Sequence, residues 1–353
     1  MIAIKNKTFA RRDWYKRRSK RLLRKRTERL EKIKNRRNNN DGLLDIITRE
    51  TRNTTTKKIR NTKRFVVPKE FSIERNLEET LKFFSKIINF ISIPNVYKGV
   101  YFDSSMVEYV TESTLMYLFA IISDVRCANY IIRGNHPKNE LIKKIYQNCG
   151  FDKLLNKDEF SYTMLDDGNA LLIRGKYVSN ELAKNVSNFL QEKTGISVAN
   201  RNKFYAALIE MMSNTYQHAY LEDNKLEKKW QIFMQKKNKV MNFIFLDTGK
   251  GIPATVNKTY KEQVKQIFFP QNIKEGDILR SAFEGHFRSR TEQENRGRGL
   301  PQIYELMHEE YIKYAAVYSG KAVAAISLSQ GNLYCSLNDS FYGTLYEFTI
   351  QGV

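Results

Sequence analysis

Cysteine, histidine and long apolar runs are all scarce in this chain of 353 residues. Its three cysteines, Cys127, Cys149 and Cys335, include no Cys-x-x-Cys pair, which argues against a disulfide framework and favours a reducing compartment. The four histidines are scattered, so their spacing indicates no zinc site. The longest apolar run, residues 115–122, is too short to span a bilayer, and the basic N-terminus lacks the apolar segment of a secretory signal. We therefore expect a soluble, cytoplasmic protein without a transmembrane segment.

Acidic residues are scarce at the start of the chain. Residues 1–66 contain 24 Lys or Arg and 6 Asp or Glu, a net charge of +18, whereas the whole chain carries +22. The basicity therefore belongs to an N-terminal arm. Few helix breakers interrupt residues 1–40, and a narrow apolar stripe favours a helix there. Residues 43–66, rich in Thr and Arg, indicate a linker.

An arm of this charge would attract a polyanion. Counterion release makes nucleic acid the commonest partner of such a segment, and Trp14 and Tyr15 could stack on bases. We expect residues 1–40 to bind DNA or RNA. An anionic membrane surface, an acidic protein partner and a simply solvated helix are the alternatives.

Beyond the arm, the apolar periodicity predicts an α/β (α+β) protein with two folded domains, residues 67–165 and 166–353. In the smaller domain we expect strands at 99–103 and 129–134, then a helix that Pro137 opens and Gly150 closes. The larger domain is predicted to contain the following segments: helices at 201–218 and 300–308, and strands at 230–235, 240–246, 322–328, 332–337 and 344–350.

The first of three polar motifs in the larger domain lies on the helix predicted at 201–218. Glu210, Asn214 and His218 are four residues apart, so they share one ridge, offset from the apolar stripe. An amide oxygen can ligate Mg²⁺, and a carboxylate one turn away can orient or deprotonate a nucleophile. Taken alone, the same pattern also suits the solvent-exposed side of an ordinary helix.

The second motif follows an apolar strand, which delivers Asp247 into a turn containing Gly249 and Gly251. The glycines allow close backbone approach or positive φ. A carboxylate here could accept a hydrogen bond from the amino group of adenine, but not from the carbonyl group of guanine. An ordinary strand-to-loop turn is the competing interpretation.

The third motif is Asn295-Arg296-Gly297-Arg298-Gly299-Leu300-Pro301-Gln302-Ile303. A Gly-x-Gly segment that opens a helix leaves backbone N–H groups and the positive helix end available to phosphate. The two arginines add charged donors. The polar stretch before this motif, residues 273–294, is predicted to act as a lid over a nucleotide. A flexible basic loop is the alternative.

These motifs, with Gly343-Thr344 before the last strand, resemble the N, G1, G2 and Gly-Thr boxes of the GHKL ATPases in their order along the chain. That superfamily includes gyrase, histidine kinases and mismatch-repair ATPases. The resemblance implies a Bergerat α/β sandwich that binds ATP with Mg²⁺ on Asn214, adenine on Asp247 and Glu210 as general base. The implied nucleotide contacts are Asn214, His218, Asp247, Gly249, Gly251, Arg296, Gly297, Arg298, Gly299, Leu300 and Thr344.

Within that superfamily, residues 214–220 (Asn-Thr-Tyr-Gln-His-Ala-Tyr) are most similar to the anti-sigma-factor serine kinases. Residues 95–156 resemble a STAS domain, the fold of anti-anti-sigma factors. The phosphorylated turn of STAS proteins corresponds to residues 111–114, where Ser113 could match the acceptor, but the Asp and Gly of that turn are absent. The resemblance therefore implies a domain that binds a protein partner.

Three functions follow from these observations. The first is an ATPase switch that closes its lid, forms a homodimer and is reset by hydrolysis. The second is a serine/threonine protein kinase of the anti-sigma type, acting on a partner STAS protein. The third is a nucleotide sensor or nucleic-acid-binding scaffold that does not hydrolyse ATP.

Overall fold

The computed structural model describes residues 62–93, 96–123, 130–150, 163–165, 168–219, 229–268, 273–287, 299–327, 329 and 331–352. The basic segment 1–40 lies outside these residues, as does the stretch 288–298. Residues Lys63–Ser92 and Gly99–Val353 form one compact unit. The helices and strands that carry the candidate site all belong to it.

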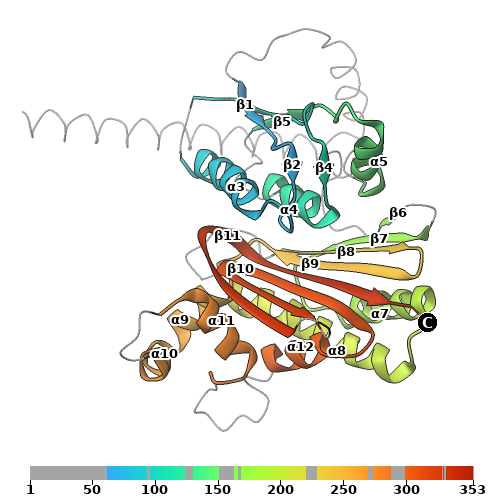
Figure 1. Ribbon diagram of the computed structural model, residues 1–353, viewed down its shortest axis with the longest axis vertical. Coiled ribbons are helices and arrows are strands. Elements are labelled where there is room, and N and C mark those ends of the chain that lie inside the picture. The colour runs from blue at the N-terminus through green and yellow to red at the C-terminus, as the bar shows by residue number, and fades with distance from the viewer. Residues whose placement is uncertain are drawn as a thin grey trace, which may run out of the picture. The chain divides into compact units, whose positions relative to one another are not determined.

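A six-stranded antiparallel sheet forms the C-terminal part of this unit (Figure 1). Its order is β10-β11-β9-β8-β7-β6, with all neighbours antiparallel. The strands are β6 (Thr163–Leu165), β7 (Ala170–Gly175), β8 (Trp230–Lys237), β9 (Val240–Asp247), β10 (Ile312–Ser327) and β11 (Gly331–Gln351). Both faces of β9 are buried, because Phe243 and Phe245 enter one core while Ile244 and Leu246 enter another. This explains why β9 is apolar throughout.

The strands predicted at 230–235 and 240–246 are confirmed as β8 and β9. The three strands predicted at the end of the chain are instead two long ones. The segments 332–337 and 344–350 both belong to β11, because an irregularity between them bends the strand without ending it. β10 begins well before the predicted start at 322, in an alanine-containing run whose periodicity is weak.

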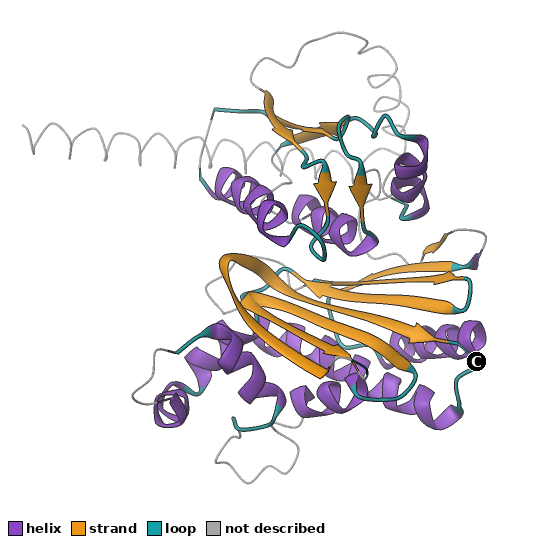
Figure 2. Cartoon of the chain, in the orientation of Figure 1, coloured by secondary structure: helices purple, strands orange, loops and turns teal. Residues whose placement is uncertain are grey.

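Helices cover one face of this sheet (Figure 2). They are α7 (Asn180–Thr194), α8 (Val198–Asn214), α9 (Ile252–Thr259), α10 (Lys261–Phe268), α11 (Glu275–Phe283) and α12 (Gly299–Met307). The helix predicted at 201–218 is α8, which starts earlier because Ser197 caps it by accepting a hydrogen bond from Asn200 N. The helix predicted near 300–308 is α12.

The prediction of a lid at residues 273–294 is wrong for residues 273–287, the part that the structure describes. α11 lies inside that stretch and buries Ile278, Leu279 and Phe283 in the core beneath the sheet. Its polar residues are spaced so that an apolar face remains, and that face packs against β10 and β11. A segment that contributes to the core in this way cannot open as a lid.

The remaining elements, residues 62–150, form what we call the N-terminal layer. It contains β1 (Thr62–Val66), β2 (Glu70–Phe71), α3 (Leu77–Ser92), β3 (Gly99–Asp103), β4 (Tyr109–Val110), α4 (Glu112–Ser123), β5 (Ile131–Gly134) and α5 (Glu140–Asn148). One sheet has the order β1-β3-β5, with β3 and β5 parallel, and β2 pairs with β4 in parallel.

The expected strands at 99–103 and 129–134 are confirmed as β3 and β5. α5 starts at Glu140 rather than at Pro137, because Asn139 is its N-cap, and Gly150 follows the helix with φ +69°. The linker predicted at residues 43–66 ends earlier than expected, because β1 occupies its last residues. Across the described ranges, no helix is both long and apolar enough to cross a membrane.

The N-terminal layer packs against the sheet face opposite the helices. One core cluster joins α3 and α4 to side chains of β7, β8, β9, β10 and β11. Every residue of α4 from Ser113 to Ile122 is buried, so the helix has no polar side. The two predicted domains therefore share a hydrophobic core.

Candidate functional site

The first motif lies at the C-terminal end of α8. Glu210 and Asn214 are partly buried, and burial raises the pKa of the Glu210 carboxyl. The Nδ2 atom of Asn214 is buried and has no hydrogen-bond partner. A buried polar atom without a partner is uncommon in a folded protein and is consistent with a missing ligand. The helix continues into a π-helical turn, Thr215–Ala219, and π-turns occur often at functional sites.

The second motif lies at the end of β9. Asp247 is 5% exposed, and its Oδ1 accepts a hydrogen bond from Gly249 N at 2.7 Å. Its Oδ2 accepts a longer one, 3.5 Å, from Thr215 Oγ1. Burial raises the pKa of Asp247 to about 7, although these hydrogen bonds act in the opposite direction. The backbone of Thr344 also hydrogen-bonds this carboxyl group.

Asp247 belongs to a row of side chains across the helix-covered face of the sheet. Thr344 on β11 is its register partner on one side, and Trp230 on β8 is its partner on the other. Ser319 on β10 pairs with Thr344, and their hydroxyl oxygens are 2.9 Å apart. The row places the Gly-Thr motif beside the second motif.

Glycines are required where these segments meet. A Cβ on Gly343, which has φ +100°, would lie 2.0 Å from the carbonyl oxygen of Asp247. A Cβ on Gly251, with φ +84°, would lie 3.1 Å from the carbonyl oxygen of Gly343. The chain after Gly251 is held by Ile252 N, which donates to Ser319 Oγ at 2.7 Å. Only glycine permits both this backbone conformation and this approach.

The third motif reaches the first through Gly299, the first residue of α12. A Cβ there would lie 2.4 Å from Glu210 Oε2 and 3.7 Å from Asn214 Oδ1. The N-terminus of α12, where backbone N–H groups have no partner within the helix, therefore adjoins both polar residues of α8. Leu300 packs against the core of the helix-covered face.

The structure thus brings together Glu210, Asn214, Asp247, Gly249, Gly251, Gly299 and Thr344. Arg296, Gly297 and Arg298 lie outside the described residues. His218 is described only by its backbone, in the π-turn. Two residues of the network, Thr215 and Ser319, were not predicted as site residues, since a Thr on an apolar stripe and a Ser in a strand carry no motif.

The residues of the candidate site fit a magnesium ion that takes few of its coordinating oxygens from the protein and most of them from a bound phosphate ligand and water. Among the described residues, no group of three or more His, Cys, Asp or Glu could hold a metal. Mg²⁺ commonly takes one or two protein oxygens and completes its shell with water and phosphate oxygens. The amide oxygen of Asn214, with the glycine at 299 next to it, is suited to such a role, and its unpartnered Nδ2 is a donor suited to a phosphate oxygen.

Ser113, the predicted match to a STAS phosphoacceptor, is fully buried at the start of α4. Its Oγ donates to Glu74 Oε1 at 2.7 Å and lies 3.1 Å from the hydroxyl of Thr111. An incoming phosphoryl group cannot reach this oxygen unless α4 moves away from its neighbours.

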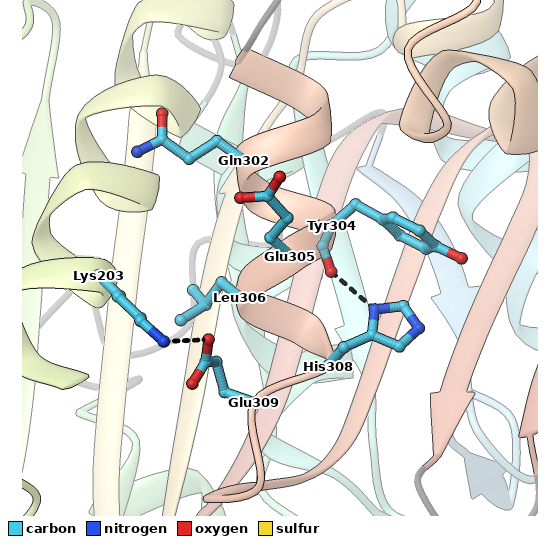
Figure 3. A pocket seen from close by; sticks show the side chains of 7 residues that line it. All are labelled: Lys203, Gln302, Tyr304, Glu305, Leu306, His308 and Glu309. Atoms are coloured by element: carbon cyan, nitrogen blue, oxygen red, sulfur yellow. Dashed lines mark hydrogen bonds and ion pairs between the residues drawn. The ribbon is translucent and has the colours of Figure 1, made fainter.

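A pocket lies at the opposite end of the α8 and α12 pair (Figure 3). It is lined by Lys203, Gln302, Tyr304, Glu305, Leu306, His308 and Glu309. An ion pair of 2.6 Å joins Lys203 near the start of α8 to Glu309 beyond the end of α12, and His308 Nδ1 bonds the Tyr304 carbonyl oxygen. Of the residues in the four motifs, Gln302 of the third motif lines this pocket.

Neither a scan against models of known protein families nor a search of curated proteins finds a match to this chain.

Proposed function

We propose that this protein binds ATP with Mg²⁺ at the edge of the sheet where α8, α12 and β9 meet, in the manner of the GHKL superfamily, and hydrolyses it as a switch. The convergence of sequence-distant motifs supports this proposal best. Gly299 adjoins Glu210 and Asn214, while Thr215, the residue after Asn214, donates to Asp247. The four segments of the resemblance therefore lie around one place.

Asp247 is the proposed adenine-binding residue. The carboxyl group is bonded by Gly249 N, Thr215 Oγ1 and the Thr344 backbone, and a donor on the ligand would be one further partner for it. The exocyclic amino group of adenine supplies such a donor, whereas guanine presents a carbonyl oxygen that a carboxylate would repel. This chemistry favours ATP over GTP.

The phosphate end is proposed to lie between α12 and the end of α8. Backbone N–H groups at the start of α12 would bind phosphate oxygens, and the helix dipole favours negative charge there. The Asn214 amide oxygen would ligate Mg²⁺. When bound, Mg²⁺ would neutralise charge that develops on the phosphate oxygens.

Glu210 is the proposed general base. Its carboxylate accepts a proton from water as the water oxygen bonds to the γ-phosphorus and the bond to ADP breaks, which releases inorganic phosphate. The raised pKa of Glu210 makes it a stronger base than an exposed glutamate at neutral pH.

Incubation of the full chain with γ-labelled ATP and Mg²⁺ tests this proposal. Release of free labelled phosphate supports an ATPase. Label on an added STAS protein, but none on free phosphate, would favour the kinase to which residues 214–220 are similar. Binding without any release would favour a nucleotide sensor or scaffold. Sedimentation with and without ATP reports whether a homodimer is part of the switch.

The basic arm is proposed to bind DNA or RNA, on the strength of its charge of +18 over residues 1–66. Deleting residues 1–40 should lower affinity for a nucleic-acid duplex and flatten its dependence on salt, since fewer phosphates are neutralised. Fluorescence anisotropy at two salt concentrations measures both quantities. Equal affinity and equal salt dependence of the full and shortened chains would assign the contact elsewhere.

A further inference from the structure

β11 carries an irregularity directly before Thr344. Thr344 pairs with Ser319 of β10, but the next pair is Phe341 with Gly320, so the register of β11 on β10 shifts at Tyr342 and Gly343. The ladder between β11 and β9 starts only at Thr344. Two residues therefore bulge out of this described part of the sheet, and bulges beside functional sites serve to aim the side chains that follow them.

A side chain from the N-terminal layer bonds the backbone of this bulge. The hydroxyl of Tyr117 on α4 accepts from Tyr342 N at 2.6 Å and donates to the Tyr342 carbonyl oxygen at 3.1 Å. Tyr117 is fully buried, and its ring stacks on Phe341 with centroids 3.9 Å apart. One hydroxyl thus bonds both backbone groups of a residue at this register shift.

The far side of the bulge forms part of the candidate site. A Cβ at Gly343 would lie 2.0 Å from the Asp247 carbonyl oxygen, so the two backbones are already in contact. The Gly343 carbonyl oxygen accepts from Ser319 Oγ at 3.3 Å, and Thr344 follows beside Asp247. A shift of Tyr342 would therefore displace Thr344 relative to the Asp247 carboxyl group.

We propose that Tyr117 is a positioning residue for the adenine end of the nucleotide site, acting through the bulge at Tyr342 and Gly343. This inference rests on the proposed function. It makes the N-terminal layer a part of the site, although no side chain of that layer would touch the ligand. Because coupling is reciprocal, a bound adenine group in turn strengthens the contact between α4 and β11.

Tyr117→Phe in the full chain tests the inference, because it removes the hydroxyl and keeps the stacked ring. Loss of these hydrogen bonds should weaken binding of ATP and of AMP by a similar factor, about fivefold. Affinity for Mg²⁺-tripolyphosphate, which lacks the base, should stay within twofold of wild type. Calorimetry measures all three ligands, and hydrogen exchange should be about fivefold faster at the Tyr342 amide.

Tyr146→Phe is the matched control, since Tyr146 is a buried tyrosine of the same layer whose hydroxyl bonds Ser104 Oγ at 3.5 Å. It should leave all three affinities and the Tyr342 exchange rate unchanged. If Tyr117→Phe binds ATP with wild-type affinity, this inference is overturned while the proposed function stands. Equal loss of ATP and tripolyphosphate would also overturn it, as a general structural effect. Failure of the wild-type chain to bind any adenine nucleotide would overturn the proposed function and this inference with it.

Discussion

Two acidic side chains withdrawn from water, Asp247 and Glu347, lie on opposite faces of the same sheet. Asp247 on the helix-covered face is surrounded by donors, namely Gly249 N and Thr215 Oγ1, and by glycines that leave space for close approach. Glu347 on β11 faces the N-terminal layer, where the carboxyl group of Glu74 lies beside it. Burial raises the pKa of Glu347, and the neighbouring Glu74 raises it further.

The difference between these two carboxyl groups separates the proposed ligand site from an internal contact between the layers. A carboxyl group among donors, bonded by the residue that follows Asn214, is the arrangement on which the proposed nucleotide site rests. Two carboxyl groups that face each other can share a proton, and the raised pKa of Glu347 then reflects packing between layers. A raised pKa alone therefore does not identify a site, and the neighbours decide.

The largest effect expected on the Asp247 side is on turnover. Glu210→Gln should reduce ATP hydrolysis by about a thousandfold, because the general base is lost, while ATP affinity changes little. Phosphate release under saturating ATP and calorimetry measure the two quantities. Normal turnover in this variant would remove Glu210 from the proposed mechanism.

The comparison also predicts unequal effects on affinity. Asp247→Ala should weaken ATP binding by about 100-fold, because adenine loses a charged acceptor in a buried place. Glu347→Gln should leave ATP affinity within about twofold, since its side chain lies on the opposite face of the sheet. Calorimetry measures the ATP affinity of both variants. Similar losses of affinity in the two would contradict the different roles assigned to Asp247 and Glu347.

A smaller effect is expected on stability without nucleotide. The pKa of Asp247, about 7 in the folded chain, exceeds the value of about 3.9 for an unfolded aspartate. The free energy of unfolding that protonated Asp247 contributes is therefore fully present below pH 4, and it is lost as the pH rises through 7. Asp247→Asn, which cannot ionise, should melt about 5 °C above wild type at pH 8, with the gap closing toward pH 4. A gap that does not change with pH would contradict the assigned ionisation.

Much of the sheet could be predicted from sequence, because β8 and β9 are apolar runs bounded by turn residues. The helix carrying Glu210 and Asn214 was equally visible from its apolar stripe. By contrast, α11 was mistaken for part of a lid, since its charged residues conceal a narrow apolar face. The start of β10 was missed because small residues such as Ala315 and Ala316 give little periodicity.

The site was predictable only where its residues form motifs along the chain. Glu210, Asn214, Asp247 and Gly299 carry such patterns, and the structure places them together. Ser319 and Tyr117 carry none, because their contacts depend on the register of β10 with β11 and on the packing of α4. Residues of that kind are found only from three-dimensional arrangement.

The complete burial of α4 bears on how this chain can be divided in the laboratory. A fragment starting near residue 166 would keep all four nucleotide motifs, yet it would present Phe233, Ile244 and Leu345 to water on an uncovered sheet face. Apolar patches of that kind promote aggregation. Insolubility of such a fragment would thus reflect the loss of the layer that covers this sheet face, and biochemistry on the proposed nucleotide site calls for a polypeptide that retains residues 63–150.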